Sequence, residues 1–141
     1  MSNRRKPDYE RARYAGYLQS PVWAATRAHW YREERQQTGR APECAVCLAI
    51  HPLELHHLDY KGVVRIVGGW ISNEAHSDLL ALCSTCHEAV HRTLDTDPGY
   101  SLFTRRTATL RVVATFRDRL TRLIMGGAQE HNTPQIRPAA R

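Results

Sequence analysis

Four cysteines stand in two closely spaced pairs, Cys44 with Cys47 and Cys83 with Cys86. Two intervening residues let both thiolates of a pair turn toward one ion, and two such pairs complete the tetrahedral shell that zinc accepts. Four thiolates leave no open coordination position, so the spacing predicts a structural zinc that closes a small domain with a limited apolar core. The alternatives are a redox-active dithiol and buried free cysteines.

Four histidines form a second group with ligand spacing. His87 and His91 lie four residues apart in a helix-like segment, so both rings project from one face. His56 and His57 are adjacent in "LELHH", a strand-like run whose successive side chains point to opposite faces. One of this pair can complete a three-imidazole site with open positions, typical of a catalytic metal, and the other can act as a base near neutral pH. Alternatively, the helix pair could be surface histidines, and His56 could bond a backbone carbonyl.

The segments that must position these groups alternate between helix and strand patterns. "DYERARYAGYL" predicts a short helix, and Ser20 before Pro21 predicts the start of a second helix that ends before Gly39. On the second helix Trp23 and Trp30 share one face, which favours a place in the core over base stacking. Three short strands and a helix follow, in the order "LELHH", "VVRIV", "DLLALC" and "CHEAVHRTL".

The end of the chain predicts a longer amphipathic helix. It should run over residues 103–125, stop at Gly126 and Gly127, and be followed by a disordered tail over residues 128–141. Its apolar stripe consists of Val113, Phe116, Leu120 and Leu123. This helix could pack on the centre of the chain, pair with a second subunit, or carry arginines to phosphate groups.

Basic charge lies on the two flanks of the 141-residue chain. Residues 1–40 carry a net charge of +5, residues 41–100 carry −5, and residues 101–141 carry +6. Nearly all of the basic residues are arginines, whose planar fork pairs with phosphate, so the pattern favours nucleic acid as a partner over simple solvated helix faces. The candidate DNA-contacting residues are Arg27, Arg32, Arg35, Arg105 and Arg106.

The motifs "CAVC", "LELHHLDY" and "DLLALCSTCHEAVH", preceded by "YLQSPVWAATRAHWYREE", resemble those of the HNH endonucleases. The resemblance covers residues 17–91 and implies an α+β fold: a small ββα-metal core clamped by a four-cysteine zinc, flanked by N-terminal helices and a long C-terminal helix. It implies that His56, His87 and His91 bind a divalent metal and that His57 is the general base. Asp78 occupies the position of the family's asparagine, where it could orient the base, although a carboxylate cannot donate as an amide does.

These patterns divide the chain into a basic helical arm (1–40), an HNH-like core (41–95), an amphipathic helix (96–127) and a tail (128–141). The expected function is hydrolysis of DNA phosphodiester bonds with backbone contacts, using structural zinc and catalytic Mg, Mn, Ni or Zn. The alternatives are a non-catalytic zinc-stabilised DNA-binding module and an accessory subunit that docks through the C-terminal helix. The sequence has no long apolar run and begins with charged residues, so we expect a cytoplasmic protein. Under the resemblance, the small size fits a protein of a phage or mobile element that acts inside a bacterial cell.

Overall fold

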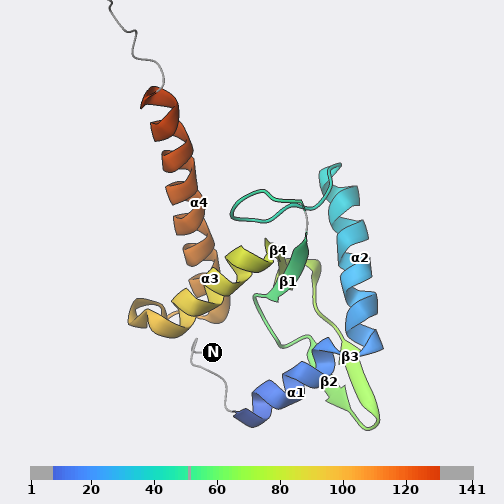
Figure 1. The fold of residues 1–141 in the computed structure, drawn as a ribbon. Coiled ribbons are helices and arrows are strands. Elements are labelled where there is room, and N and C mark those ends of the chain that lie inside the picture. Colours follow the sequence, from blue (N-terminus) through green and yellow to red (C-terminus); the bar gives the residue numbers. More distant parts are fainter. Residues whose placement is uncertain (1–7, 51, 131–141) are drawn as a thin grey trace, which may run out of the picture.

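A computed structural model describes residues 8–50 and 52–130 of the chain. Its elements follow the order α1 (Asp8–Leu18), α2 (Pro21–Thr38), β1 (Leu53–His57), β2 (Val63–Ile66), β3 (Gly69–Ser72), β4 (Leu79–Cys83), α3 (Ser84–Thr96) and α4 (Arg105–Glu130) (Figure 1). Single 3-10 turns lie at His76–Asp78 and Pro98–Tyr100. The expected α+β class is confirmed, and each strand and helix predicted from the sequence forms, with the end of α4 as the main departure from the expected bounds.

The central sheet consists of β1 and β4, which pair antiparallel with Leu53 opposite Cys83 and His57 opposite Leu79. α3 begins at the residue after β4, because Cys83 serves as its N-cap and its sulfur accepts from the amide of Cys86. The strand therefore leads into the helix without a loop. This fixes where the first turn of α3 stands relative to the sheet.

The N-terminal helices cover one face of this sheet. Ser20 caps α2 by accepting from the amide of Trp23, and Gly39 ends it in the left-handed conformation that glycine adopts without a side-chain clash. The predicted core role of the two tryptophans is confirmed, since each is 5% exposed. They pack in a cluster with Tyr17, Leu55, Leu79 and Ala81.

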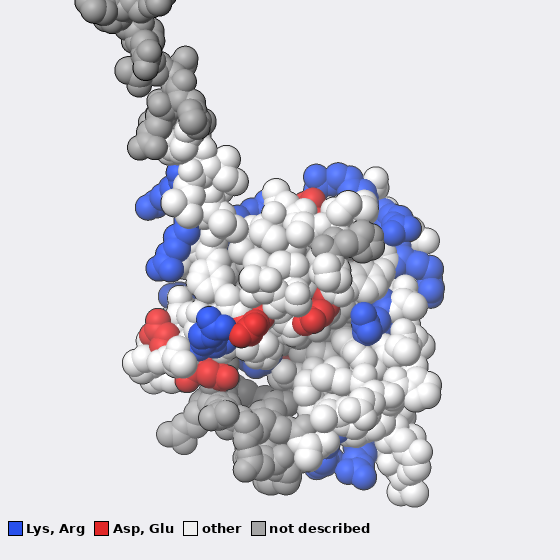
Figure 2. Space-filling view, in the orientation of Figure 1, with Lys and Arg blue, Asp and Glu red and all other residues white. Residues whose placement is uncertain are grey.

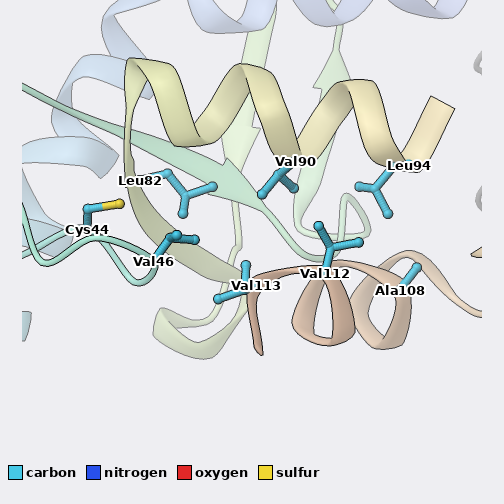
Figure 3. Close-up of a cluster of buried hydrophobic side chains, with 8 residues drawn as sticks. All are labelled: Cys44, Val46, Leu82, Val90, Leu94, Ala108, Val112 and Val113. Carbon is cyan, nitrogen blue, oxygen red and sulfur yellow. The ribbon is translucent and has the colours of Figure 1, made fainter. Parts of the chain in front are cut away.

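α3 and α4 cover the opposite face, as Figure 3 shows for the second core cluster. Leu82 points from β4 into this cluster, whereas Leu79 and Ala81 of the same strand belong to the first cluster. This division follows from the alternation of side chains along a strand. The cluster consists of Cys44, Val46, Leu82, Val90, Leu94, Ala108, Val112 and Val113.

α4 is longer than the sequence predicts. The expected stop at Gly126 and Gly127 is wrong, because the helix continues to Glu130. Glycine in a helix costs about 1 kcal/mol relative to alanine but introduces no clash, so a helix already formed over twenty residues can pass through two of them. Leu123 was predicted to lie on the packed stripe, yet it is 72% exposed where α4 extends beyond the body (Figure 1). The tail predicted over residues 128–141 is wrong for residues 128–130, which belong to α4, and residues 131–141 lie outside the described residues.

The predicted strand "VVRIV" forms one arm of a two-stranded ribbon, the β2–β3 hairpin, in which Val63 pairs with Ser72 and Ile66 with Gly69. The ribbon's base is closed by a backbone bond of 2.7 Å from the amide of Asn73 to the carbonyl of Gly62. A Cβ on Gly62 would lie 2.4 Å from the amide nitrogen of Glu74. Only glycine lets the two chain segments approach this closely.

Candidate metal centre

The four cysteines come together at one end of the central sheet. Their sulfur atoms all lie within 4.8 Å of one another. Sγ of Cys47 lies 3.7 Å from Sγ of Cys83. A tetrahedral zinc with Zn–S bonds of about 2.3 Å separates two sulfur ligands by about 3.8 Å, so this spacing fits a shared ion. The four cysteines are thus arranged to bind a metal ion such as zinc.

The surroundings of Cys44 favour a thiolate. Burial alone raises the pKa of this thiol, but backbone N–H groups, that of Cys47 foremost, outweigh burial and lower the pKa to about 7. A thiol that ionises near neutral pH releases its proton at little cost in free energy when a metal ion binds to the sulfur. Cys44, in the loop before β1, is therefore easily deprotonated to bind a metal together with Cys83 of β4 and Cys86 of α3.

A second cluster joins His56 of β1 to His87 and His91 of α3, with one ring nitrogen of each within 4.8 Å of the others. Nε2 of His87 lies 3.1 Å from Nε2 of His91. Two nitrogens bound to one tetrahedral zinc at about 2.0 to 2.1 Å lie about 3.3 Å apart, so the pair has close to the separation of two ligands. Three imidazoles would leave coordination positions for water or substrate.

His56 contributes a buried nitrogen that has no partner among the described residues. Its side chain is 1% exposed, and Nδ1 has no hydrogen-bond partner. Its other nitrogen, Nε2, lies 3.3 Å from Oγ1 of Thr109 on α4. An unsatisfied buried polar atom costs about 1 to 3 kcal/mol, so Nδ1 is the atom that a metal ion would satisfy.

Two imidazoles of this cluster, those of His56 and His91, have lowered pKa values that favour the neutral form, which is the form that binds a metal. Burial, followed by the charge of Arg105 and the neighbouring imidazoles, lowers the pKa of His56 well below its usual value. Burial and the neighbouring His87 lower the pKa of His91 to about 4. Nδ1 of His87 is bonded to the carboxylate of Glu54, so its Nε2 is left to face His91. Glu54 lies two residues before His56 and could have been found from strand alternation.

His57 lies on the opposite face of β1, as strand geometry predicts, and it is sealed from solvent. Its side chain is 0% exposed, with Tyr60 stacked on the ring and Trp23 close beside it. Nε2 lies 3.0 Å from the carboxylate of Glu74, and Nδ1 lies 2.5 Å from the hydroxyl oxygen of Tyr14. Both ring nitrogens are therefore hydrogen-bonded within the protein.

Asp78 does not orient His57 in this structure, contrary to the expectation from its position. One carboxylate oxygen accepts from Arg106 and the other accepts from the amide of Ala75 at 3.0 Å. Asp78 closes the 3-10 turn before β4, and both of its carboxylate oxygens are used in these bonds. Glu74 makes the contact instead. No local pattern in the sequence indicated this role for Glu74, nor those of Tyr14 and Thr109.

The predicted arginines fall into two groups. Arg105 is part of the site: its Nε donates to the carbonyl of His57 at 2.8 Å, and its Nη2 lies 3.4 Å from Nε2 of His56. Arg106 bonds Asp78 and the carbonyl of Ser77, so its guanidinium is held within the protein. The α2 candidates Arg27, Arg32 and Arg35 are exposed. Figure 2 shows Lys and Arg side chains spread over this face, along the exposed part of α4 and at the side of α2, with acidic side chains among them.

Comparison of the chain with protein-family models, with curated proteins and with solved structures found no match. Within residues 8–50 and 52–130, no helix combines the length and the apolar character that crossing a membrane requires. The features of this chain that indicate a function are therefore the two clusters of ligand atoms and the residues that surround them.

Proposed function

We propose that this chain is a metal-dependent endonuclease of the HNH type that hydrolyses phosphodiester bonds in DNA. The observation that carries the proposal is the convergence of His56, His87 and His91 from a strand and a helix, with a buried nitrogen of His56 unpartnered. Three protein ligands leave room for water and for a phosphate oxygen. A divalent metal bound there would offset charge on the phosphate and on the leaving oxygen.

The order of the elements supports the proposal. β1, β4 and α3 follow one another as strand, strand and helix, with the hairpin inserted between the strands, in agreement with a ββα-metal core. The four-cysteine cluster adjoins this core through Cys83 and Cys86, as expected of the accessory zinc. Imidazole ligands favour zinc, nickel or manganese, while open positions and a phosphate ligand also admit magnesium.

His57 is the proposed general base, but it can act only if water reaches the ring nitrogen that Tyr14 now covers. The carboxylate of Glu74 only accepts, so Nε2 of His57 carries the proton and Nδ1 accepts from the hydroxyl of Tyr14. Water can reach Nδ1 only after Tyr14 has moved away. The proposal therefore includes a movement of the Tyr14 side chain away from His57 when DNA binds.

Contacts with DNA are assigned to the exposed arginines of α2, namely Arg27, Arg32 and Arg35. Arg105 places a further cation beside the histidine cluster, where it can pair with the phosphate that is cleaved. Contacts of this kind carry little sequence information. Binding should consequently be weakly specific and should weaken steeply as salt rises.

The sealed position of His57 favours a second candidate function, a zinc-stabilised DNA-binding module without catalytic activity. In that case the bonds of His57 to Tyr14 and Glu74 serve only to hold α1 and the hairpin on β1. The two candidates agree on DNA and on the four-cysteine zinc. They differ in their predictions for a substitution of His57, which would stop DNA cleavage in the nuclease but would affect only the stability of the fold in the binding module.

A plasmid-nicking assay separates the two. Supercoiled DNA is incubated with the protein and Mg, Mn, Ni or Zn, beside the variants His57→Ala and His91→Ala and the exposed control His29→Ala. The nuclease predicts that His57→Ala keeps its metal but stops nicking, that His91→Ala also loses metal, and that the control remains active. If the wild type nicks with none of the metals, or if His57→Ala is fully active, the nuclease assignment is wrong.

A further inference from the structure

We propose that Glu74 is a positioning residue for His57, supplied by the segment that the β2–β3 hairpin inserts between the two central strands. The proposal rests on the role of His57 as general base. It assigns a catalytic contribution to an insertion that lies outside the compact ββα pattern. Glu74 would act through His57 and would not itself touch DNA or metal.

The carboxylate of Glu74 is buried at the meeting point of several elements. Its side chain is 0% exposed. It accepts from the hydroxyl of Tyr17 on α1, from the hydroxyl of Ser72 on β3 and from Nε2 of His57 on β1. Burial alone raises the pKa of Glu74, but hydrogen bonds from His57, Ser72 and Tyr17 outweigh burial and lower the pKa to about 2. The group is thus a buried anion held by three donors.

A carboxylate in this place decides which nitrogen of His57 carries the proton. It offers no hydrogen, so Nε2 must donate and the lone pair must lie on Nδ1. Nδ1 is the nitrogen on the side of Tyr14, whose oxygen lies 2.5 Å away. When a water replaces that hydroxyl, one water proton moves to Nδ1 and the water oxygen bonds to phosphorus. The bond from phosphorus to the leaving sugar oxygen breaks, and that oxygen takes a proton from solvent. The imidazolium keeps its Nε2–H on the Glu74 carboxylate, which stabilises the charge without taking a proton.

The backbone around Glu74 is built to hold it there. The amide of Asn73 donates to the carbonyl of Gly62 at 2.7 Å, and the absence of a side chain at Gly62 allows the approach. Oγ of Ser72 lies 2.7 Å from Oγ1 of Thr26, which ties the carboxylate's neighbour to α2. The carboxylate is therefore fixed from two sides before any substrate arrives. Such rigidity is what preorganisation of a base requires.

The test compares the wild type with Glu74→Gln, both loaded with zinc at the cysteine cluster. Ring nitrogen shifts from ¹⁵N NMR report the His57 tautomer, and plasmid nicking reports kcat and KM. Glutamine can present an amide N–H to Nε2, so we expect a shift toward the tautomer protonated at Nδ1. We also expect kcat to fall by about 10²-fold or more, the usual contribution of a general base, with KM and metal content unchanged.

Two control variants separate positioning from folding. Tyr17→Phe removes another donor to the same carboxylate and should keep the Nε2-protonated tautomer, because the bond from Glu74 to His57 remains. Glu88→Gln makes the same chemical change at an exposed glutamate that pairs with Arg92. It should leave both the tautomer and nicking as they are in the wild type.

The proposal is overturned if neutral His57 in the wild type carries its proton on Nδ1. This can be measured without any variant. It is equally overturned if Glu74→Gln folds and His57 keeps its tautomer. If the wild type fails to nick DNA, the proposed nuclease function fails, but the tautomer comparison still decides whether Glu74 positions His57. A Glu74→Gln variant with the altered tautomer and full kcat would show that the contact is structural and would also sink the proposal.

Discussion

Replacement of Thr109 by valine should weaken metal binding at the three-histidine cluster. Thr109 is fully buried on α4, and its Oγ1 lies 3.3 Å from Nε2 of His56. With a metal on Nδ1, Nε2 is protonated and donates a hydrogen bond to Oγ1 of Thr109. Valine has nearly the same shape but no acceptor, so the buried Nε2–H would lose its partner. Arg105, whose Nη2 lies 3.4 Å from Nε2, can only donate and would favour the tautomer that blocks Nδ1.

The size of the effect follows from the cost of an unsatisfied buried donor. That cost is about 1 to 3 kcal/mol, and each 1.4 kcal/mol changes a dissociation constant about tenfold. The Kd for zinc should therefore rise by about 5- to 150-fold, in the range found when a partner of a ligand histidine is removed. Chelator competition measures this Kd on protein whose cysteine cluster is already filled. Thr109→Ser should restore most of the affinity.

Thr115 offers a matched control on the same helix. Its Oγ1 donates to the carbonyl of Arg111 at 2.9 Å, within α4 itself, so Thr115→Val makes the same chemical change away from the cluster. Zinc affinity should be unchanged in this control. The reasoning is refuted if Thr109→Val binds zinc as tightly as the wild type, or if the two valine variants weaken binding equally.

Three further outcomes are expected. Cys83→Ser should lose the zinc of the cysteine cluster together with folded signal in circular dichroism, because the metal links the loop before β1 to β4 and α3; a metal-free variant that stays folded would contradict the clamp. Gly62→Ala should destabilise the protein in urea unfolding far more than Gly69→Ala, since a Cβ at 62 meets backbone at 2.4 Å and one at 69 meets nothing within 4 Å. Folding lowers the pKa of Glu74 from 4.5 to about 2, so its ionised form adds stability that is complete above pH 4.5 and is lost as pH falls through about 2. The stability difference between wild type and Glu74→Gln should thus narrow below pH 4.5, and a constant difference would contradict the assigned shift.

The sequence by itself determined the parts of the molecule whose geometry is local. Cysteines three residues apart, histidines four apart on one helix and the serine–proline start of α2 act within one or two turns of chain, so their arrangement follows from backbone geometry. The divergence of His56 and His57 follows in the same way from the alternation of a strand. The predicted end of α4 is wrong because Gly126 and Gly127 only weaken a helix, and the long helix that precedes them continues through both.

Tertiary packing decided what each histidine touches. Glu74 is 17 residues from His57 and Thr109 is 53 residues from His56 in the sequence. Neither contact can be predicted from a local spacing of residue types. The hairpin brings a carboxylate over β1, and α4 brings a hydroxyl to the other face, because the two apolar clusters pull these elements onto opposite sides of the sheet. Asp78, nearer to β4, instead closes its own turn and pairs with Arg106. The spacing of residues thus predicts metal ligands that lie on the same helix or strand. The hydrogen-bond partners of those ligands depend on how the apolar faces of distant elements pack.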